Sequence, residues 1–190
     1  MKVSSEALEW ITYNEDPNLK PSWDGRYHAR WDDVGKCWDI AWGLRYDEDG
    51  SEVVKGTAWT HNHALKAFNV YISNTEKKIT KFIECNHISL NQQQFDALVD
   101  FEYNSGGFSP SNGICKVLLA HKFDQVSFQM CRWIFSNKKF VQGLANRRYK
   151  ECYLFDKGIY AKEVPQIKRE DYDYYMNLVK NVELVLESKK

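Results

Sequence analysis

The spacing of hydrophobic residues changes its period once along this chain of 190 residues, and that change limits the folds it can adopt. Between about residues 23 and 59, aromatic and β-branched residues alternate with polar ones, with turn signals at 34–35 (VG) and 47–50 (DEDG). This alternation predicts a three-stranded antiparallel meander. From residue 60 onward, apolar residues recur at helical spacing. Strands and helices in separate parts of the sequence predict an α+β fold, because βαβ units require them to alternate.

A short helix is predicted before the sheet and several helices after it. Ser4 and Ser5 cap an apolar run that ends near Tyr13, and Pro17 and Pro21 prevent its continuation. In the helix predicted at 89–106, a Ser-x-x-Gln pattern at the start predicts a capping box, and two glycines mark the end. The later helices are predicted over 60–84, 89–106, about 112–120, 124–135, 142–155 and 169–187. A polymer would fit a cleft between two lobes joined by the long helix 60–84.

Composition excludes several classes of function. The formal net charge is zero, which argues against a surface that follows nucleic-acid phosphates. No segment reaches membrane-spanning length. His61 and His63 lie two residues apart, which does not place both on one helical face, so we expect no metal site. The five cysteines form no CxxC pair and are predicted to be free, buried thiols: Cys37, Cys85, Cys115, Cys131 and Cys152.

Acidic residues gather in and just before the predicted sheet. Glu15 and Asp24 precede or open it, and Asp32, Asp33 and Asp39 lie within it. Burial raises the pKa of one carboxyl while a better-solvated one stays ionised, and such pairs act as acid and base in glycoside hydrolysis. A structural interpretation stands beside this one, with Glu15 as a polar loop residue and Asp32 and Asp33 as turn residues.

Two stretches resemble the phage-type lysozymes, the glycoside hydrolase family of tailed-phage endolysins. Residues 89–107 read SLNQQQFDALVDFEYNSGG, similar to the family's central helix, L-T-x-x-Q-F-D-A-L-V-S-F-x-F-N-x-G. Residues 132–155 read RWIFSNKKFVQGLANRRYKECYLF, similar to R-W-x-x-x-x-G-x-x-x-x-G-L-x-x-R-R-x-x-E-x-x-L-F. The two matches occur in the family's order and cover most of residues 89–155.

This resemblance implies one lysozyme-like domain over residues 1–190. Its small lobe, about 14–60, would contain the three-stranded sheet. The long helix would connect that lobe to a larger helical lobe formed by about 1–13 and 85–160. A further helix at about 169–187 has no counterpart in the short family members, and its Tyr-rich stripe is typical of packing, although a partner contact is also open.

The family's E-G-x-x-L-x-A-Y-x-D motif is similar to residues 15–24, EDPNLKPSWD. The Glu, the Leu and the final Asp keep their spacing at Glu15, Leu19 and Asp24. The resemblance implies Glu15 as the general acid and Asp24 as the residue that orients or activates the attacking water. An alternative alignment takes Asp32 as the family's Asp, but Asp24 needs no gap from Glu15 and is preferred.

The next family motif, D-x-x-G-x-x-T-I-G-Y-G, is most similar to residues 38–43, WDIAWG, with two departures. Ala41 replaces a Gly, and Asp39 stands where the family's Thr helps to position water. A Thr can only hold water by hydrogen bonds, whereas a carboxylate can act as a base, or as a nucleophile when close enough. Carboxyl groups about 6.5–9.5 Å apart indicate inversion and about 5–5.5 Å indicate retention. The sequence leaves this choice open, and Asp39 can also point away.

Three further residues are implied as substrate contacts by their places in these motifs: Asn104, Arg147 and Trp42. An Arg of the pair 147–148 can meet wall-peptide carboxylates with its planar fork. It can equally form an ion pair inside the chain, since Glu151 lies four residues after Arg147. Asn104 can bind substrate or cap the end of its helix.

We therefore expect a muramidase that hydrolyses the β-1,4 bond between N-acetylmuramic acid and N-acetylglucosamine in peptidoglycan and so lyses cells. We expect a monomer that binds a glycan strand and needs no cofactor, nucleic acid or membrane. The rivals are a catalytically inactive lysozyme-like module that binds glycan or protein, which the missing Thr favours, a lytic transglycosylase, and a structural part of a phage particle or secretion machine. The N-terminus shows no export signal, so synthesis in the cytoplasm is expected, with action on the cell wall during phage lysis or as an antibacterial toxin.

Overall fold

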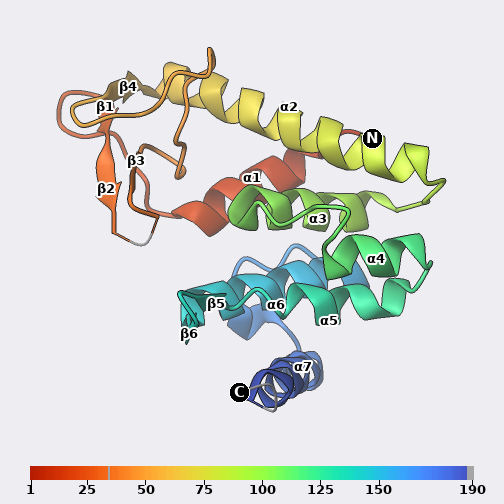
Figure 1. Ribbon diagram of the computed structural model, residues 1–190. Helices are drawn as coiled ribbons and strands as arrows, with labels where there is room; N and C mark the ends of the chain where they lie inside the picture. The colour runs from red at the N-terminus through yellow and green to blue at the C-terminus, as the bar shows by residue number, and fades with distance from the viewer. Residues whose placement is uncertain (34, 188–190) are drawn as a thin grey trace. The chain divides into compact units, whose positions relative to one another are not determined.

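The computed structural model describes the backbone of residues 1–33 and 35–187, and side chains up to residue 181 within them. The chain divides into two compact units (Figure 1). Unit 1 comprises Met1–Trp10 and Glu76–Lys190, and unit 2 comprises Ile11–Thr75. The turn predicted at 34–35 falls partly outside the described residues.

Helix α1 (Ser5–Glu15) begins as predicted and ends two residues later than predicted. Ser4 is its N-terminal cap, because its Oγ accepts the N–H of Ala7 at 3.0 Å. In unit 1, the helix is held by Trp10, whose indole N–H donates to the carbonyl of Ala161 at 3.0 Å. The helix continues into unit 2 and ends on Glu15.

Unit 2 contains two small antiparallel sheets in place of the predicted three-stranded meander. Strand β1 (Arg26–His28) pairs with β4 (Ala58–Thr60), in the register Tyr27 to Trp59. Strand β2 (Arg30–Asp32) pairs with β3 (Cys37–Asp39), in the register Trp31 to Trp38. The chain after β3 pairs with itself through isolated bridges, Ile40 to Leu44 and Tyr46 to Glu52, before β4 returns to pair with β1. The α+β class is confirmed, but the prediction of a single three-stranded sheet is wrong.

The core of unit 2 is aromatic. Trp42 packs against Tyr27, His61 and Phe68, with ring centroids 5.4–5.9 Å apart. Trp59 stacks on His63 at 4.9 Å. The pairs with His61, Phe68 and His63 join the strand region to α2 (His61–Cys85), the long helix predicted at 60–84.

Unit 1 is helical, in the order that the sequence predicts (Figure 1). Helix α3 (Gln92–Ser105) ends at Gly106, which has a φ of +61°, as the two glycines predicted. Its predicted start at Ser89 is wrong by two or three residues. The capping box is formed by Asn91 and Gln94, because Asn91 Oδ1 accepts the Gln94 N–H at 2.8 Å and Gln94 Oε1 accepts the Asn91 N–H at 3.1 Å.

Helix α3 packs against α6 (Gln142–Lys157) in unit 1. The unit also contains α4 (Gly113–Leu119), α5 (Val126–Met130), the 3₁₀ turns η1 (Phe123–Gln125) and η2 (Val164–Gln166), the hairpin β5 (Phe135–Ser136) and β6 (Lys139–Phe140), and α7 (Arg169–Glu187). The hairpin was not predicted. No helix in the described part of the chain is long and apolar enough to cross a membrane.

Helix α7 uses its tyrosines for packing, as its stripe predicted. Tyr175 is buried, and its hydroxyl donates to Asp156 Oδ2 at 2.9 Å. Tyr149 donates to Met176 Sδ at 2.6 Å. The side chains of Val182 and Leu186, which extend the predicted stripe, lie outside those described.

The five cysteines are free thiols, as predicted. Three are buried: Cys115, Cys131 and Cys152. The prediction that all five are buried is wrong, because Cys85 is exposed and Cys37 is half-buried.

Candidate active site

Glu15 is the last residue of α1, and its carboxyl lies beside a tight turn of unit 2. A Cβ atom added to Gly43 would lie 3.5 Å from Glu15 Oε2. The side chain is half-buried. Buried Ala7, Trp10 and Ile11 fix the axis of the helix, so the position of its terminal carboxyl is set by packing rather than by a loop.

The turn beside Glu15 runs from Ile40 to Leu44. These two residues exchange backbone hydrogen bonds of 3.0 and 2.9 Å. Ala41 and Gly43 have φ angles of +53° and +77°. Ala41, where the family motif has a Gly, therefore holds a left-handed conformation that costs a residue with a Cβ about 1 kcal/mol. The turn brings the main chain at Gly43 close to the Glu15 carboxyl, so a Cβ atom there would lie in van der Waals contact with it.

Gly43→Ala is expected to lower any activity that depends on Glu15 by about 10-fold. The new methyl group would lie in van der Waals contact with Glu15 Oε2, where it would displace water from the carboxyl, and it would strain a backbone with positive φ. The activity of purified protein at equal folded fraction is the measurement. Gly50→Ala is the control, because Gly50 also has a positive φ but has open space around it. Equal activities of the two variants would show that contact with Glu15 is unimportant.

Asp24 lies in the turn before β1 and is exposed. Its Oδ1 accepts the N–H of Arg26 at 3.1 Å, and its Oδ2 accepts a hydrogen bond from His28 Nε2 at 3.0 Å. The bond from His28 is the main reason that the pKa of Asp24 lies below its ordinary value. The carboxylate is thus ionised and locally oriented, as a group that handles water needs to be.

Asp39 ends β3, one residue before the turn that contacts Glu15. Its Oδ1 accepts a 2.8 Å hydrogen bond from Arg30 Nε, directly opposite on β2. Its side chain is 16% exposed. Asp32, the alternative candidate, is the last residue of β2, and its Oδ2 lies 3.6 Å from Arg45 Nη2. The structure therefore places Glu15, Asp24 and Asp39 in unit 2 and connects Asp39 to Glu15 through a five-residue turn.

A family model described as phage lysozyme matches residues 21–151. The chain belongs to the phage lysozyme family. The match contains Asp24 and Asp39 but begins six residues after Glu15, so the role of Glu15 depends on the motif at 15–24 and on the geometry above.

The relatives of this family member include two phage endolysins. It is 40% identical over 72 residues to the endolysin of Bacillus phage PZA, a match that covers 37% of this chain and 28% of that protein. It is 38% identical over 72 residues to the endolysin of Bacillus phage B103, covering 37% of this chain and 27% of that protein. The chain thus matches little more than a quarter of the length of these relatives.

Solved structures that share its fold include an endolysin and a muramidase domain. The endolysin from Escherichia coli O157:H7 phage FAHEc1 superposes with a TM-score of 0.68 at 24% identity, over 85% of this chain and 97% of that one. The muramidase domain of SpmX from Asticaccaulis excentricus superposes with a TM-score of 0.64 at 21% identity, over 82% and 98%. At these identities, the likeness establishes the lysozyme-like fold.

The candidate substrate contacts Trp42 and Arg147 are both buried in this family member. Trp42 is 7% exposed within the aromatic core of unit 2. Arg147 is 6% exposed and donates to both carboxylate oxygens of Asp100, at 2.5 and 3.2 Å. Arg147 Nε also lies 3.5 Å from Glu151, so the ion pair left open by the sequence is present. Asn104, half-buried, accepts a 2.9 Å bond from Arg148 and does not cap its helix.

These residues belong to a buried charged network between α3 and α6. Arg148 is fully buried, donates to Glu151 and lies 4.9 Å from the centroid of the Phe101 ring. Asp100 and Glu151 are also fully buried. Burial raises the pKa of Glu151 to about 8, although Arg148 acts in the opposite direction. The double Arg of the family motif therefore joins two helices.

Glu151→Gln is expected to become progressively more stable relative to the wild type as the pH rises from about 5 to about 8. The folded-state pKa of Glu151 is raised, so the stability that its proton provides is present below the ordinary value of 4.5 and is lost through about 8. The relative change can reach about 1.4 kcal/mol per pH unit. Urea unfolding of both proteins across this range measures it, and a constant difference would contradict the raised pKa.

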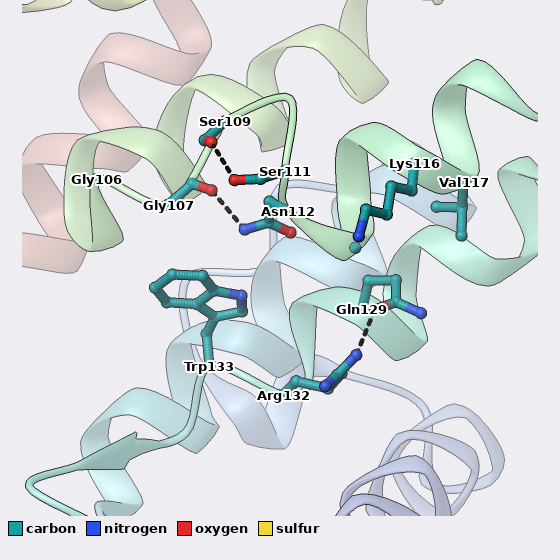
Figure 2. A pocket seen from close by; sticks show the side chains of 11 residues that line it. Gly106, Gly107, Ser109, Ser111, Asn112, Lys116, Val117, Gln129, Arg132 and Trp133 are labelled. Carbon is teal, nitrogen blue, oxygen red and sulfur yellow. Dashed lines mark hydrogen bonds between the residues drawn. The ribbon is translucent and has the colours of Figure 1, made fainter.

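The sequence did not predict the pocket in unit 1 that Figure 2 shows. It is lined by the loop after α3, the first turns of α4 and the residues around the end of α5. The Arg-Trp pair at 132–133, which is part of a family motif, also lines this pocket.

Proposed function

We propose that this chain is a muramidase that hydrolyses the β-1,4 bond between N-acetylmuramic acid and N-acetylglucosamine, with Glu15 as general acid. The observation that carries this proposal is the Glu15 carboxyl, fixed at the end of α1 against the Ile40–Leu44 turn in a chain of the phage lysozyme family. A half-buried carboxyl at the end of a packed helix has a fixed position from which a general acid can reach a leaving oxygen.

In this mechanism, Glu15 protonates the glycosidic oxygen as the bond to the anomeric carbon breaks. Positive charge then develops on the sugar ring, and water attacks the anomeric carbon. Asp24, held by Arg26 and His28, orients that water or takes its proton. Asp39 stabilises the developing positive charge, with Arg30 fixing its orientation.

The relatives support the cell wall as target, because two of them are named endolysins of Bacillus phages and a structural neighbour is a muramidase domain. Lysis of cells follows if the protein reaches the wall. Asn104 remains a proposed contact with the glycan, since its side chain is half-buried and not sealed in the core. Trp42 and Arg147 are given no such role, because their burial leaves little surface for a sugar.

The roles of the two aspartates are tested with Asp24→Asn and Asp39→Asn on purified peptidoglycan, following turbidity and reducing ends. Asn removes the charge but keeps one acceptor oxygen, which can still accept the bond from Arg30 in Asp39→Asn and one of the two bonds, from Arg26 or His28, in Asp24→Asn. We expect each substitution to lower kcat by about 10- to 100-fold with little change in KM. Asp49→Asn, at an exposed turn, is the control. Wild-type protein that releases no reducing ends would contradict the proposed function itself, and an unchanged kcat would exclude the aspartate concerned.

A further inference from the structure

A pair of tryptophans on the two-stranded sheet of β2 and β3 lies outside the aromatic core of unit 2 (Figure 1). Trp31 and Trp38 are opposite each other across the strands, with ring centroids 5.6 Å apart and ring planes at 65°. Trp31 is 47% exposed, whereas the core residues Trp42 and Trp59 are 7% and 4% exposed. The exposed part of the Trp31 indole therefore serves neither the core nor the proposed mechanism.

The two indoles lie on the face of this sheet opposite to the candidate catalytic residue Asp39. Side chains of successive residues in a strand point to opposite faces, and Trp31 and Trp38 alternate with the pair Arg30 and Asp39. A ligand on the indoles would therefore not take the place of a substrate at the Asp39 carboxyl. Residues 25–37 also lie between the two family motifs, so Trp31 belongs to neither motif.

Polar groups border the exposed indole and fix its orientation. Trp31 Nε1 donates to Asp33 Oδ1 at 3.1 Å, and Lys36 Nζ lies 3.8 Å from the same oxygen. The side chains of Asp33 and Lys36 are 87% and 72% exposed, so both remain accessible to a ligand. The contact with Trp38 and the bond to Asp33 hold the ring before a ligand arrives, so little side-chain entropy is lost on binding.

The size of this surface favours a sugar over a protein. A protein partner typically covers about 800 Å² on each side of an interface. Here a single half-exposed indole is bordered by charged side chains. A flat aromatic ring fits the C–H face of one β-linked sugar, because both surfaces are apolar. The sugar's hydroxyl groups would donate to Asp33, and its N-acetyl carbonyl would accept from Lys36.

We propose that Trp31 and Trp38 form a secondary binding site for the glycan strand of peptidoglycan, separate from the proposed catalytic groups. Trp31 would stack on one N-acetylated sugar ring, and Trp38 would support the indole from the neighbouring strand. The glycan would be held at this site without being cleaved there. The inference rests on the proposed function for its choice of glycan. The site would raise the affinity for the polymer and leave the chemical step unchanged.

Hydroxyl-radical footprinting tests this site without any catalysis. The probe is a soluble glycan strand freed of its stem peptides, added to the Glu15→Gln protein so that the strand stays intact. Saturating strand should reduce the oxidation of Trp31 at least about twofold, because a stacked sugar covers the exposed ring. The oxidation of Tyr174, a 49% exposed side chain of unit 1, should not change. Unchanged oxidation of Trp31 would overturn the inference.

Two substitutions of Trp31 separate binding from a purely structural role. In titration calorimetry with the same strands, Trp31→Ala should bind about 5- to 10-fold more weakly, and Trp31→Phe should recover most of the affinity because it keeps a flat apolar face. On peptidoglycan, Trp31→Ala should raise KM by a similar factor and leave kcat within a factor of about two. Tyr174→Ala is the matched control and should bind as the wild type does. An unchanged affinity in Trp31→Ala, or a loss confined to kcat, would overturn the inference.

Vesicles of phosphatidylglycerol and phosphatidylethanolamine are the second probe, because exposed tryptophans also occur at membrane interfaces. Binding to vesicles that needs Trp31, without binding to the strands, would overturn the inference. The binding measurements need no bond cleavage. A protein that binds strands through Trp31 but cleaves none would therefore refute only the proposed function. A protein that cleaves glycan while the strand leaves Trp31 equally open to oxidation would refute only this inference.

Discussion

Glu15→Gln is expected to reduce the release of reducing ends from purified peptidoglycan by about 100- to 10,000-fold, the range typical of a lost general acid. Gln fits the same space at the end of α1 and beside Gly43, but it carries no proton that it can donate. The glycosidic oxygen is a poor leaving group when it is not protonated. The substitution therefore slows the bond-breaking step but does not weaken binding of the glycan. The loss should therefore appear in kcat rather than in KM.

Glu6→Gln is the matched control for this prediction. Glu6 lies on the same helix, in its first turn, and is exposed. Its substitution should leave the rate of reducing-end release within a factor of about two of the wild-type rate. Surface substitutions usually change the free energy of unfolding by less than about 0.5 kcal/mol, so the variant should stay folded. If Glu15→Gln retains the wild-type rate while folded, Glu15 is not the acid, and the resemblance at 15–24 describes ancestry alone.

Asp100→Asn is expected to destabilise the protein by about 3 kcal/mol, which lowers the Tm by roughly 6–12 °C for a chain of this size. Asp100 neutralises Arg147 inside the interface of α3 and α6, and an arginine cannot shed its charge. This loss of unfolding free energy lies at the lower end of the range for a broken buried ion pair. Glu151 can ionise in the variant and so neutralise part of the charge of Arg147.

Asp173→Asn makes the same chemical change in an exposed pair. Asp173 lies 3.1 Å from Arg169 on α7, with side chains 52% and 85% exposed. Exposed pairs contribute at most about 1 kcal/mol, so the Tm should change by no more than about 4 °C. Similar losses in the two variants would mean that burial does not set the strength of the Asp100 pair.

The sequence predicted the helices well because their signals are local. The spacing of apolar residues located α2, α6 and α7, and Gly106 marked the end of α3. The start of α3 was misplaced because Ser89 and Asn91 both precede a Gln by three residues, and only packing selects the second. The pairing of β1 with β4 was missed because it depends on how residues 40–57 close on themselves, which is a long-range property.

The catalytic roles of the candidate residues stay predictions. Motif spacing selected Glu15 and Asp39, and in the structure the Glu15 carboxyl lies beside the Ile40–Leu44 turn that follows Asp39. The burial of a side chain could not be predicted from motif spacing. Arg147 and Trp42 occupy motif positions that also suit a surface role, and only the neighbours Asp100 and Phe68, distant in sequence, show that they serve the core.

The most direct test of the account is mass spectrometry of the soluble fragments that the wild-type protein releases from purified peptidoglycan. Hydrolysis with Glu15 as acid predicts fragments that end in reducing N-acetylmuramic acid, and their loss in Glu15→Gln. Fragments that end in 1,6-anhydro-N-acetylmuramic acid would show a lytic transglycosylase, and the absence of new ends would show a lysozyme fold without the activity.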